Sequence, residues 1–266
     1  ISGAVIEING TEYHLTKNDG ENNLHSGLDF YHGRLWKVAD ADDTHVTFEM
    51  DSPDGDQGYP GALVMKVTYS LDEENTLMIH YEAEPDQDTI INMTNHSYFN
   101  LNGHKSGDVL NHTLWLNADA FTPADAASIP TGEIRSVEGT SMDFRTDKTI
   151  GKDIEADYEP LVFGKGYDHN WVLKNEGEFD KVAEVAGDES GIHMSVLTDL
   201  PGVQIYTANF LDGVKGRDGA VYEMRDAICL ETQYYPDAIH HENFPGPICK
   251  KGEKYDTRTA YRFRVK

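Results

Sequence analysis

Polar side chains interrupt four segments of the chain where a strand would carry apolar residues, and their types are those of sites that transfer protons and bind hydroxyl groups. The richest segment is 92–101 (NMTNHSYFNL), in which amide, imidazole and hydroxyl groups adjoin two aromatic residues. This mixture is typical of a sugar-sized pocket, because rings cover the C–H faces of a sugar and convergent polar groups bind its hydroxyls. A structural network of buried hydrogen bonds would use the same residue types, so the segment alone leaves both interpretations open.

Three shorter segments each add one reactive group. NLHSG at 23–27 contains His25, GYDHNW at 166–171 contains Asp168, and CLETQ at 229–233 contains Glu231. Each has an ordinary explanation when taken alone: an exposed histidine in a turn, an aspartate in a turn, and an exposed glutamate in an alternating strand. The apolar neighbours of Glu231 favour partial burial, which raises the pKa of a carboxyl group and makes it a usable base near neutral pH.

Several other reaction classes lack their sequence motifs. The chain has no phosphate-binding P-loop, no GxGxxG before a helix, no GxSxG, no HExxH and no paired CxxC. Among its histidines, His240 and His241 are adjacent, so on a strand they would point to opposite faces and would not readily share an ion. We therefore expect no metal and no cofactor.

Charge and composition restrict the partners. The 266 residues include 22 Lys and Arg against 47 Asp and Glu, a net charge of −25, which argues against nucleic acid and against anionic membranes. There is no run of about 18 apolar residues and no signal peptide at the start. Two cysteines are too few for a disulfide framework, and Cys229 is expected to be a buried thiol. We expect a cytoplasmic monomer or homodimer with a small-molecule partner.

Short strands must position these groups. Apolar and polar residues alternate at 63–69 and 77–83 around DEEN, which predicts an antiparallel hairpin. Glycine- and aspartate-rich turns separate the strands, and the best helix candidate is short, at 149–159. The pattern predicts an all-β chain, an antiparallel sandwich or barrel in one domain over 1–266. Further strands are expected at 90–94, 113–117, 169–174, 191–198, 203–207 and 257–265.

Taken together, the motifs resemble one family, the aldose 1-epimerases or galactose mutarotases. The resemblance covers essentially the whole chain and implies a large antiparallel β-sandwich of the galactose mutarotase-like supersandwich type with few short helices. It also implies an isomerase that interconverts the α and β anomers of free hexoses such as galactose and glucose. The motifs that carry it, in the family's order, are NLHSG, NMTNHSYFNLNG, GYDHNWVL, GVQIYTANFLDG, LETQYYPDAIHHENFP and GEKYDTRTAYRF.

The resemblance also implies roles for individual residues. Glu231 in LETQ corresponds to the base that takes the proton from the C1 hydroxyl, and His96 in NHSYF corresponds to the acid that protonates the ring oxygen. These side-chain types suit proton transfer near pH 7. The substrate-binding positions that it implies are His25, Tyr98, Asp168 and Gln204.

The chain departs from the family in two places. Ser26 stands where the family usually has a second glycine. The family's first strands and an Asn-Arg pair that contacts sugar would precede Ile1, so the chain is either a fragment or receives this segment from elsewhere. Without the pair, we expect sugar binding to be weaker by about 1–3 kcal/mol, the scale of a charged hydrogen bond.

Three alternatives use the same residues differently. A relative acting on hexose 6-phosphates would need an Arg cluster for the dianion, and none accompanies these motifs. A non-catalytic carbohydrate-binding β-sandwich would not need both His96 and Glu231. A glycosidase could use Asp168 and Glu231 as its two carboxyl groups.

Overall fold

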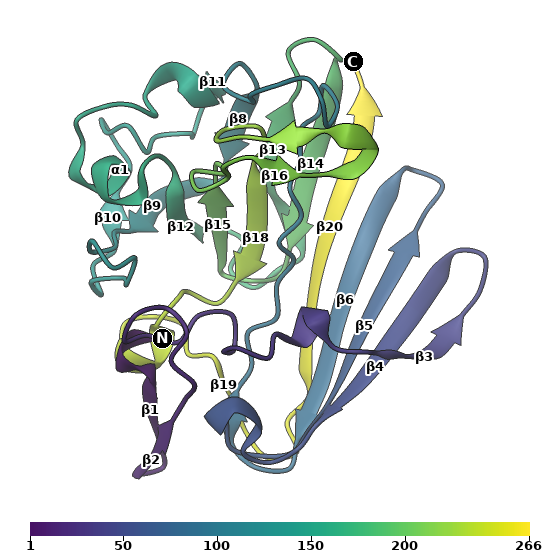
Figure 1. Ribbon diagram of the computed structural model, residues 1–266, viewed down its shortest axis with the longest axis vertical. Helices are drawn as coiled ribbons and strands as arrows, with labels where there is room; N and C mark the ends of the chain where they lie inside the picture. The colour runs from purple at the N-terminus through teal and green to yellow at the C-terminus, as the bar shows by residue number, and fades with distance from the viewer. The chain divides into compact units, whose positions relative to one another are not determined.

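Antiparallel strands account for most of the regular structure in the computed structural model, which describes residues 1–266 (Figure 1). The chain forms two compact units. The first comprises 1–72, 77–93 and 236–258, and the second comprises 73–76, 94–235 and 259–266. No helix is long and apolar enough to cross a membrane. The expectation of an all-β, antiparallel fold with few short helices is confirmed.

An up-and-down antiparallel sheet forms most of the first unit (Figure 1). The predicted hairpin is confirmed, because β5 and β6 pair along their whole lengths, and Met65 and Val67 are both buried on one face. The strands of this sheet, in chain order, are β3 (Lys37–Ala41), β4 (His45–Ser52), β5 (Leu63–Leu71) and β6 (Thr76–Pro85).

A hairpin of β1 (Val5–Ile8) and β2 (Thr11–His14) also belongs to this unit and packs Ile6 and Ile8 into a small core. The expected strand at 90–94 is wrong. Only β7 (Thr89–Ile90) forms, because its partner β19 (Ile248–Cys249) is two residues long and offers no ladder for the residues that follow.

The second unit contains two sheets. Tyr261 of β20 donates a hydrogen bond of 2.9 Å to the carbonyl of Leu230 in β18, and the hydroxyls of Thr232 and Thr259 also bond, so the two sheets pack face to face as a β-sandwich. One sheet consists of β10 (Arg135–Ser136), β9 (Ala118–Thr122), β12 (Asp168–Leu173), β15 (Gly202–Tyr206) and β18 (Cys229–Gln233), in that order. The other contains β11 (Lys148–Thr149), β8 (Thr113–Leu116), β13 (Asp180–Ala186), β14 (Ile192–Thr198) and the part of β20 (Tyr255–Val265) in this unit. A separate hairpin pairs β16 (Val214–Lys215) with β17 (Val221–Tyr222).

The helix expected at 149–159 is wrong. A single 3₁₀ turn occupies Ile150–Lys152, and the α-helix α1 begins only at Glu159 and ends at Gly164. Pro160 explains the start, because proline has no N–H to lose in the first turn of a helix and its fixed φ suits that turn. The helix ends where Lys165 adopts a left-handed conformation.

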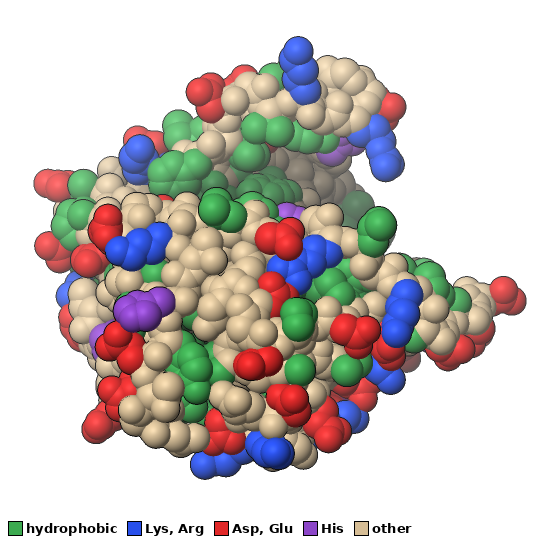
Figure 2. Space-filling view, turned by 60° about the horizontal axis from the view of Figure 1, so that its bottom comes forward, with side chains coloured by type: hydrophobic (Ala, Val, Ile, Leu, Met, Phe, Trp, Pro, Cys, Tyr) green, Lys and Arg blue, Asp and Glu red, His purple; other side chains and the backbone are tan.

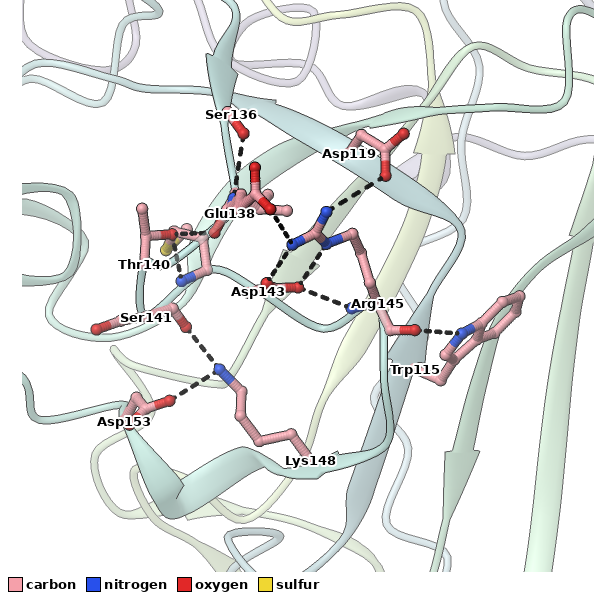
Figure 3. A network of polar contacts seen from close by, with 12 residues as sticks. Trp115, Asp119, Ser136, Glu138, Thr140, Ser141, Asp143, Arg145, Lys148 and Asp153 are labelled. Carbon is pink, nitrogen blue, oxygen red and sulfur yellow. Dashed lines mark hydrogen bonds and ion pairs between the residues drawn. The ribbon is translucent and has the colours of Figure 1, made fainter.

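Ion pairs hold the long connection between β10 and α1 (Figure 3). Arg145 binds both carboxylate oxygens of Asp143, with Nε 3.0 Å from Oδ1 and Nη2 2.7 Å from Oδ2. Lys148 donates to Asp153 at 2.9 Å and to the carbonyl of Ser141 at 2.8 Å. We call these five residues the Arg145–Lys148 network; each of its acids has a cationic partner.

Acidic side chains are spread over the face shown in Figure 2, with Lys and Arg between them and no large basic patch. This distribution agrees with the net charge of −25.

Candidate functional site

Three adjacent strands of the second unit bring polar residues from distant segments to one face of the five-stranded sheet. Asp168 on β12 is opposite Tyr206 on β15, and Tyr206 is opposite Cys229 on β18. In the next row on the same face, Asn170 is opposite Gln204, and Gln204 is opposite Glu231. Because side chains alternate between the faces of a strand, all these groups share one side. We call this side the polar face, defined by Asp168, Asn170, Gln204, Tyr206, Cys229, Glu231 and Gln233.

The opposite face of the same strands explains why the sequence folds this way. Trp171, Ile205 and Leu230 alternate with the polar residues and are fully buried. Trp171 also donates its indole N–H to the carbonyl of Met142 at 3.1 Å, so its polar atom is satisfied. Burial of this apolar set fixes which residues remain on the polar face.

A chain of amide hydrogen bonds orders the polar face. Gln233 Nε2 lies 3.3 Å from both Gln204 Oε1 and Asn170 Oδ1, and donates to them. Gln204 then donates from its own Nε2 to Asp168 Oδ1 at 2.8 Å. These bonds fix the direction in which each amide points, so the second oxygen of Asp168 is held as an acceptor in a fixed place.

His96 reaches the polar face from an irregular segment rather than from a strand. Phe99 and Ile228 exchange two backbone hydrogen bonds of 2.9 Å each, which tie this segment to the residue preceding β18. As a result His96 Nε2 lies 3.5 Å from Glu231 Oε1. The imidazole stacks on the ring of Tyr98 with centroids 5.1 Å apart and meets the edge of Tyr206 at 5.9 Å.

The two carboxyl groups of the site are buried without a Lys or Arg beside them. Burial, together with the nearby Asp168 carboxylate, raises the pKa of Glu231 to about 8. Burial also raises the pKa of Asp168 to about 6, against the lowering effect of the hydrogen bond from Gln204. Neither carboxylate forms an ion pair with Lys or Arg. Carboxyl groups tuned in this way exchange protons readily near neutral pH.

The structure brings five of the six predicted site residues together in the second unit: His96, Tyr98, Asp168, Gln204 and Glu231. The sixth, His25, belongs to the first unit, in a turn that Asn18 closes by donating to the carbonyls of Leu24 and Gly27. Its neighbour Ser26, at the family's glycine position, has a φ of 73°, which is strained for a residue with a side chain.

Sequence reasoning did not assign roles to Tyr206, Asn170 and Gln233. The signal was present, since Tyr206 is two residues from Gln204 and Gln233 is two residues from Glu231, and residues so spaced share a strand face. What was missing was the register that aligns the strands.

The assumption that His240 and His241 lie on a strand is wrong. His240 ends a 3₁₀ turn, Ala238–His240, and His241 follows it. Both rings face the same carboxylate: His240 Nδ1 lies 2.7 Å from Asp237 Oδ1, and His241 Nε2 lies 3.7 Å from Oδ2. A tight turn, unlike a strand, leaves consecutive side chains on neighbouring sides.

Comparison with known proteins identifies the family. The family model described as aldose 1-epimerase matches residues 1–262. Galactose mutarotase of Bos taurus is 42% identical over 266 residues, covering 100% of this chain and 76% of the relative. Aldose 1-epimerase of Escherichia coli K12 is 38% identical over 266 residues, covering 99% and 76%.

Solved structures show the same fold. An aldose epimerase homologue from C. elegans superimposes with a TM-score of 0.91 at 30% identity, covering 100% of this chain and 79% of the other. Galactose 1-epimerase from Lactobacillus acidophilus gives a TM-score of 0.87 at 27% identity, with 100% and 76% covered. The chain belongs to the aldose 1-epimerase family.

Proposed function

We propose that this chain interconverts the α and β anomers of free hexoses such as galactose and glucose, with Glu231 as the base and His96 as the acid. Membership of the aldose 1-epimerase family makes it an isomerase of this class. The observation that supports the two roles is the 3.5 Å separation of His96 Nε2 and Glu231 Oε1 at a face lined with groups that bind hydroxyls.

The reaction needs two proton transfers and no cofactor. Glu231 accepts the proton of the C1 hydroxyl while the C1–O5 bond breaks, and His96 gives its proton to O5, which leaves the open-chain aldehyde. Rotation about C1–C2 exposes the other face of the carbonyl. On closure O5 attacks C1, its proton returns to His96, and Glu231 returns its proton to O1. Each proton transfer of this kind contributes about 10²–10⁴-fold to the rate.

The remaining residues position the sugar. Asp168, with one oxygen held by Gln204, accepts hydrogen bonds from sugar hydroxyls through the other. Tyr98 and Tyr206, edge to face at 6.2 Å, offer ring surface to the C–H groups of the sugar. His25 stays a predicted substrate-binding residue on the basis of the family motif.

Charge argues against a phosphorylated substrate. A hexose 6-phosphate dianion would approach the Asp168 and Glu231 carboxyl groups, which have no Lys or Arg ion-paired to them. Such ligands are bound in proteins by Arg clusters, so free sugars fit the polar face better.

We also propose that the two compact units belong to one galactose mutarotase-like domain, since the family match runs through both. We propose in addition that the protein is cytoplasmic and is a monomer or homodimer. Its net charge of −25 supports this through repulsion between copies of the chain.

Polarimetry of freshly dissolved α-D-galactose or α-D-glucose tests the function. The wild-type chain should speed equilibration above the buffer rate, and Glu231→Gln and His96→Ala should each lose about 10²–10⁴-fold. Matched controls are Glu133→Gln and His104→Ala, which remove an exposed acid and an exposed imidazole elsewhere on the second unit. Retained turnover in Glu231→Gln or His96→Ala would contradict the assigned roles. Calorimetry with galactose separates a binder from a catalyst, since a binding protein would bind sugar and leave the buffer rate unchanged.

A further inference from the structure

Cys229 has no role in the proton transfers, yet it lies beside both groups that carry them. Cys229 and Glu231 are two residues apart on β18 and so point to the same face. One ligand atom from each of His96, Cys229 and Glu231 lies within 4.8 Å of the other two. An imidazole nitrogen, a sulfur and a carboxylate oxygen thus converge on one small volume.

The spacing of this trio fits a tetrahedral ion. In a zinc site with ordinary bond lengths, a nitrogen and an oxygen ligand lie about 3.4 Å apart, and a nitrogen and a sulfur about 3.6 Å apart. The observed separation of His96 Nε2 and Glu231 Oε1 is 3.5 Å. The sulfur, at no more than 4.8 Å from the other two atoms, needs a contraction of at most about 1.2 Å, which small side-chain rotations can supply.

Charge at the polar face favours a cation as well. Glu231 is only 6% exposed, Asp168 is close enough to affect it, and neither carboxylate forms an ion pair with Lys or Arg. A divalent ion would neutralise carboxyl groups that have no Lys or Arg ion-paired to them.

A second cluster of possible metal ligands differs from this trio. His80, Glu82 and Asp256 in the first unit also gather within 4.8 Å, but Lys254 Nζ already lies 2.5 Å from Glu82 and 3.1 Å from Asp256. A protein cation therefore occupies the position that a metal would take there.

We propose that His96, Cys229 and Glu231 form an inhibitory site for Zn²⁺ or a similar thiophilic divalent ion. Thiolate and imidazole ligands select Zn²⁺ and Cd²⁺ over Mg²⁺ and Ca²⁺, which prefer oxygen ligands alone. On binding, Cys229 releases its thiol proton to solvent, Glu231 and His96 release the protons that they carry, and the sulfur, the carboxylate oxygen and the imidazole nitrogen bond to the ion, with water in the fourth position. The bound ion occupies the acid and the base, so it blocks sugar turnover; this consequence, unlike the binding, rests on the proposed function.

Cysteine substitution with spectroscopic detection tests the site. Co²⁺ is titrated into the wild-type chain without sugar, and the thiolate-to-cobalt charge-transfer absorbance is recorded; Zn²⁺ is then added to displace it. We expect the band in the wild type, its loss in Cys229→Ser, and its retention in Cys249→Ser, the matched control that removes the other thiol. A band that follows Cys249, or no band in the wild type, would overturn the proposal.

A second variant keeps the test decisive if Cys229→Ser does not fold. Glu231→Gln removes a different ligand and should weaken Zn²⁺ binding, measured by equilibrium dialysis, by at least roughly tenfold, since even groups behind a ligand alter metal affinity by 10–100-fold. Unchanged affinity in Glu231→Gln would contradict the ligand set.

The two proposals can fail separately. A chain that shows the Cys229-dependent band but does not speed mutarotation keeps the metal site and loses the proposed function. A chain that epimerises sugar at full rate in Zn²⁺ and shows no band keeps the function and loses the site. Inhibition that EDTA reverses, and that Cys249→Ser retains, is the result expected if both hold.

Discussion

The polar face and the Arg145–Lys148 network, both in the second unit, shift the pKa of a carboxyl group in opposite directions. In the network, Arg145 holds Asp143 through two hydrogen bonds and lowers the pKa of that carboxyl group (Figure 3). On the polar face, burial and the nearby Asp168 raise the pKa of Glu231 to about 8, with no Lys or Arg to lower it. A carboxylate paired with Arg or Lys stays charged and holds a loop in place. A buried carboxyl group without such a partner is available to exchange protons.

Removal of the Asp168 charge should have the largest effect on the polar face. Asp168→Asn removes a charged acceptor, so kcat/KM should fall by about 10–100-fold, the equivalent of 1.5–3 kcal/mol for a charged hydrogen bond. The same change removes a negative charge that raises the pKa of Glu231, so that pKa should fall. Since the base must be deprotonated, the acidic limb of the pH–rate profile should move to lower pH.

The measurement is kcat/KM for mutarotation from pH 5 to 9, with Asp143→Asn as the matched control from the network. That control should leave the profile of Glu231 in place, because Asp143 is not among the groups that shift it. An acidic limb that stays in place in Asp168→Asn would refute the electrostatic coupling of the two acids.

Breaking the network should affect stability and not turnover. Lys148→Met leaves Asp153 and the Ser141 carbonyl without their donor, and the Lys148 side chain is only 9% exposed. The expected loss is about 1–3 kcal/mol of the free energy of unfolding, or several degrees in Tm. Lys174→Met, which removes a half-exposed ion pair with Asp119, is the control and should change Tm little. Calorimetric melting with a parallel polarimetric assay separates the two effects; a loss of turnover without a loss of Tm would break the contrast.

The raised pKa of Glu231 should also make the free energy of unfolding depend on pH. The pKa of Glu231 is about 8 in the folded chain against 4.5 ordinarily, so between these values the folded state retains a proton that the unfolded state has released. The contribution of Glu231 to stability is therefore full below about pH 4.5 and is lost as pH rises through about 8. Glu231→Gln lacks this loss, so the Tm of the variant relative to wild type should rise from pH 5 to pH 8. A Tm difference that falls over this range would show the opposite sign of pKa shift.

Alternation alone predicted much of the fold. The hairpin around 63–69 and 77–83 was predicted because buried and exposed residues follow a period of two, which the paired strands β5 and β6 show. The segment at 90–94 is also rich in β-branched residues, but the strand there comprises only Thr89–Ile90. Strand length depends on a partner strand, which the local pattern does not reveal. The helix begins at Glu159 rather than near residue 149, and Pro160, a permitted first-turn residue, is the sequence signal for that start.

The site was predictable only in part, for a related reason. Family motifs pointed to His96 and Glu231, and the structure places their side-chain atoms 3.5 Å apart. Tyr206 and Gln233 share that face through strand register, which long-range pairing determines and no single segment encodes. Residues 96 and 231 lie far apart along the chain and come together only when the sheet is assembled.

The exchange of two main-chain hydrogen bonds between Phe99 and Ile228 has an evolutionary consequence. Every residue except proline can form such bonds, so the distance between the imidazole and the carboxylate is inherited from the path of the backbone. The side chains of Phe99 and Ile228, which pack in the core, can therefore be replaced together with their neighbours without removal of these bonds. The reactive geometry can outlast the sequence that first produced it.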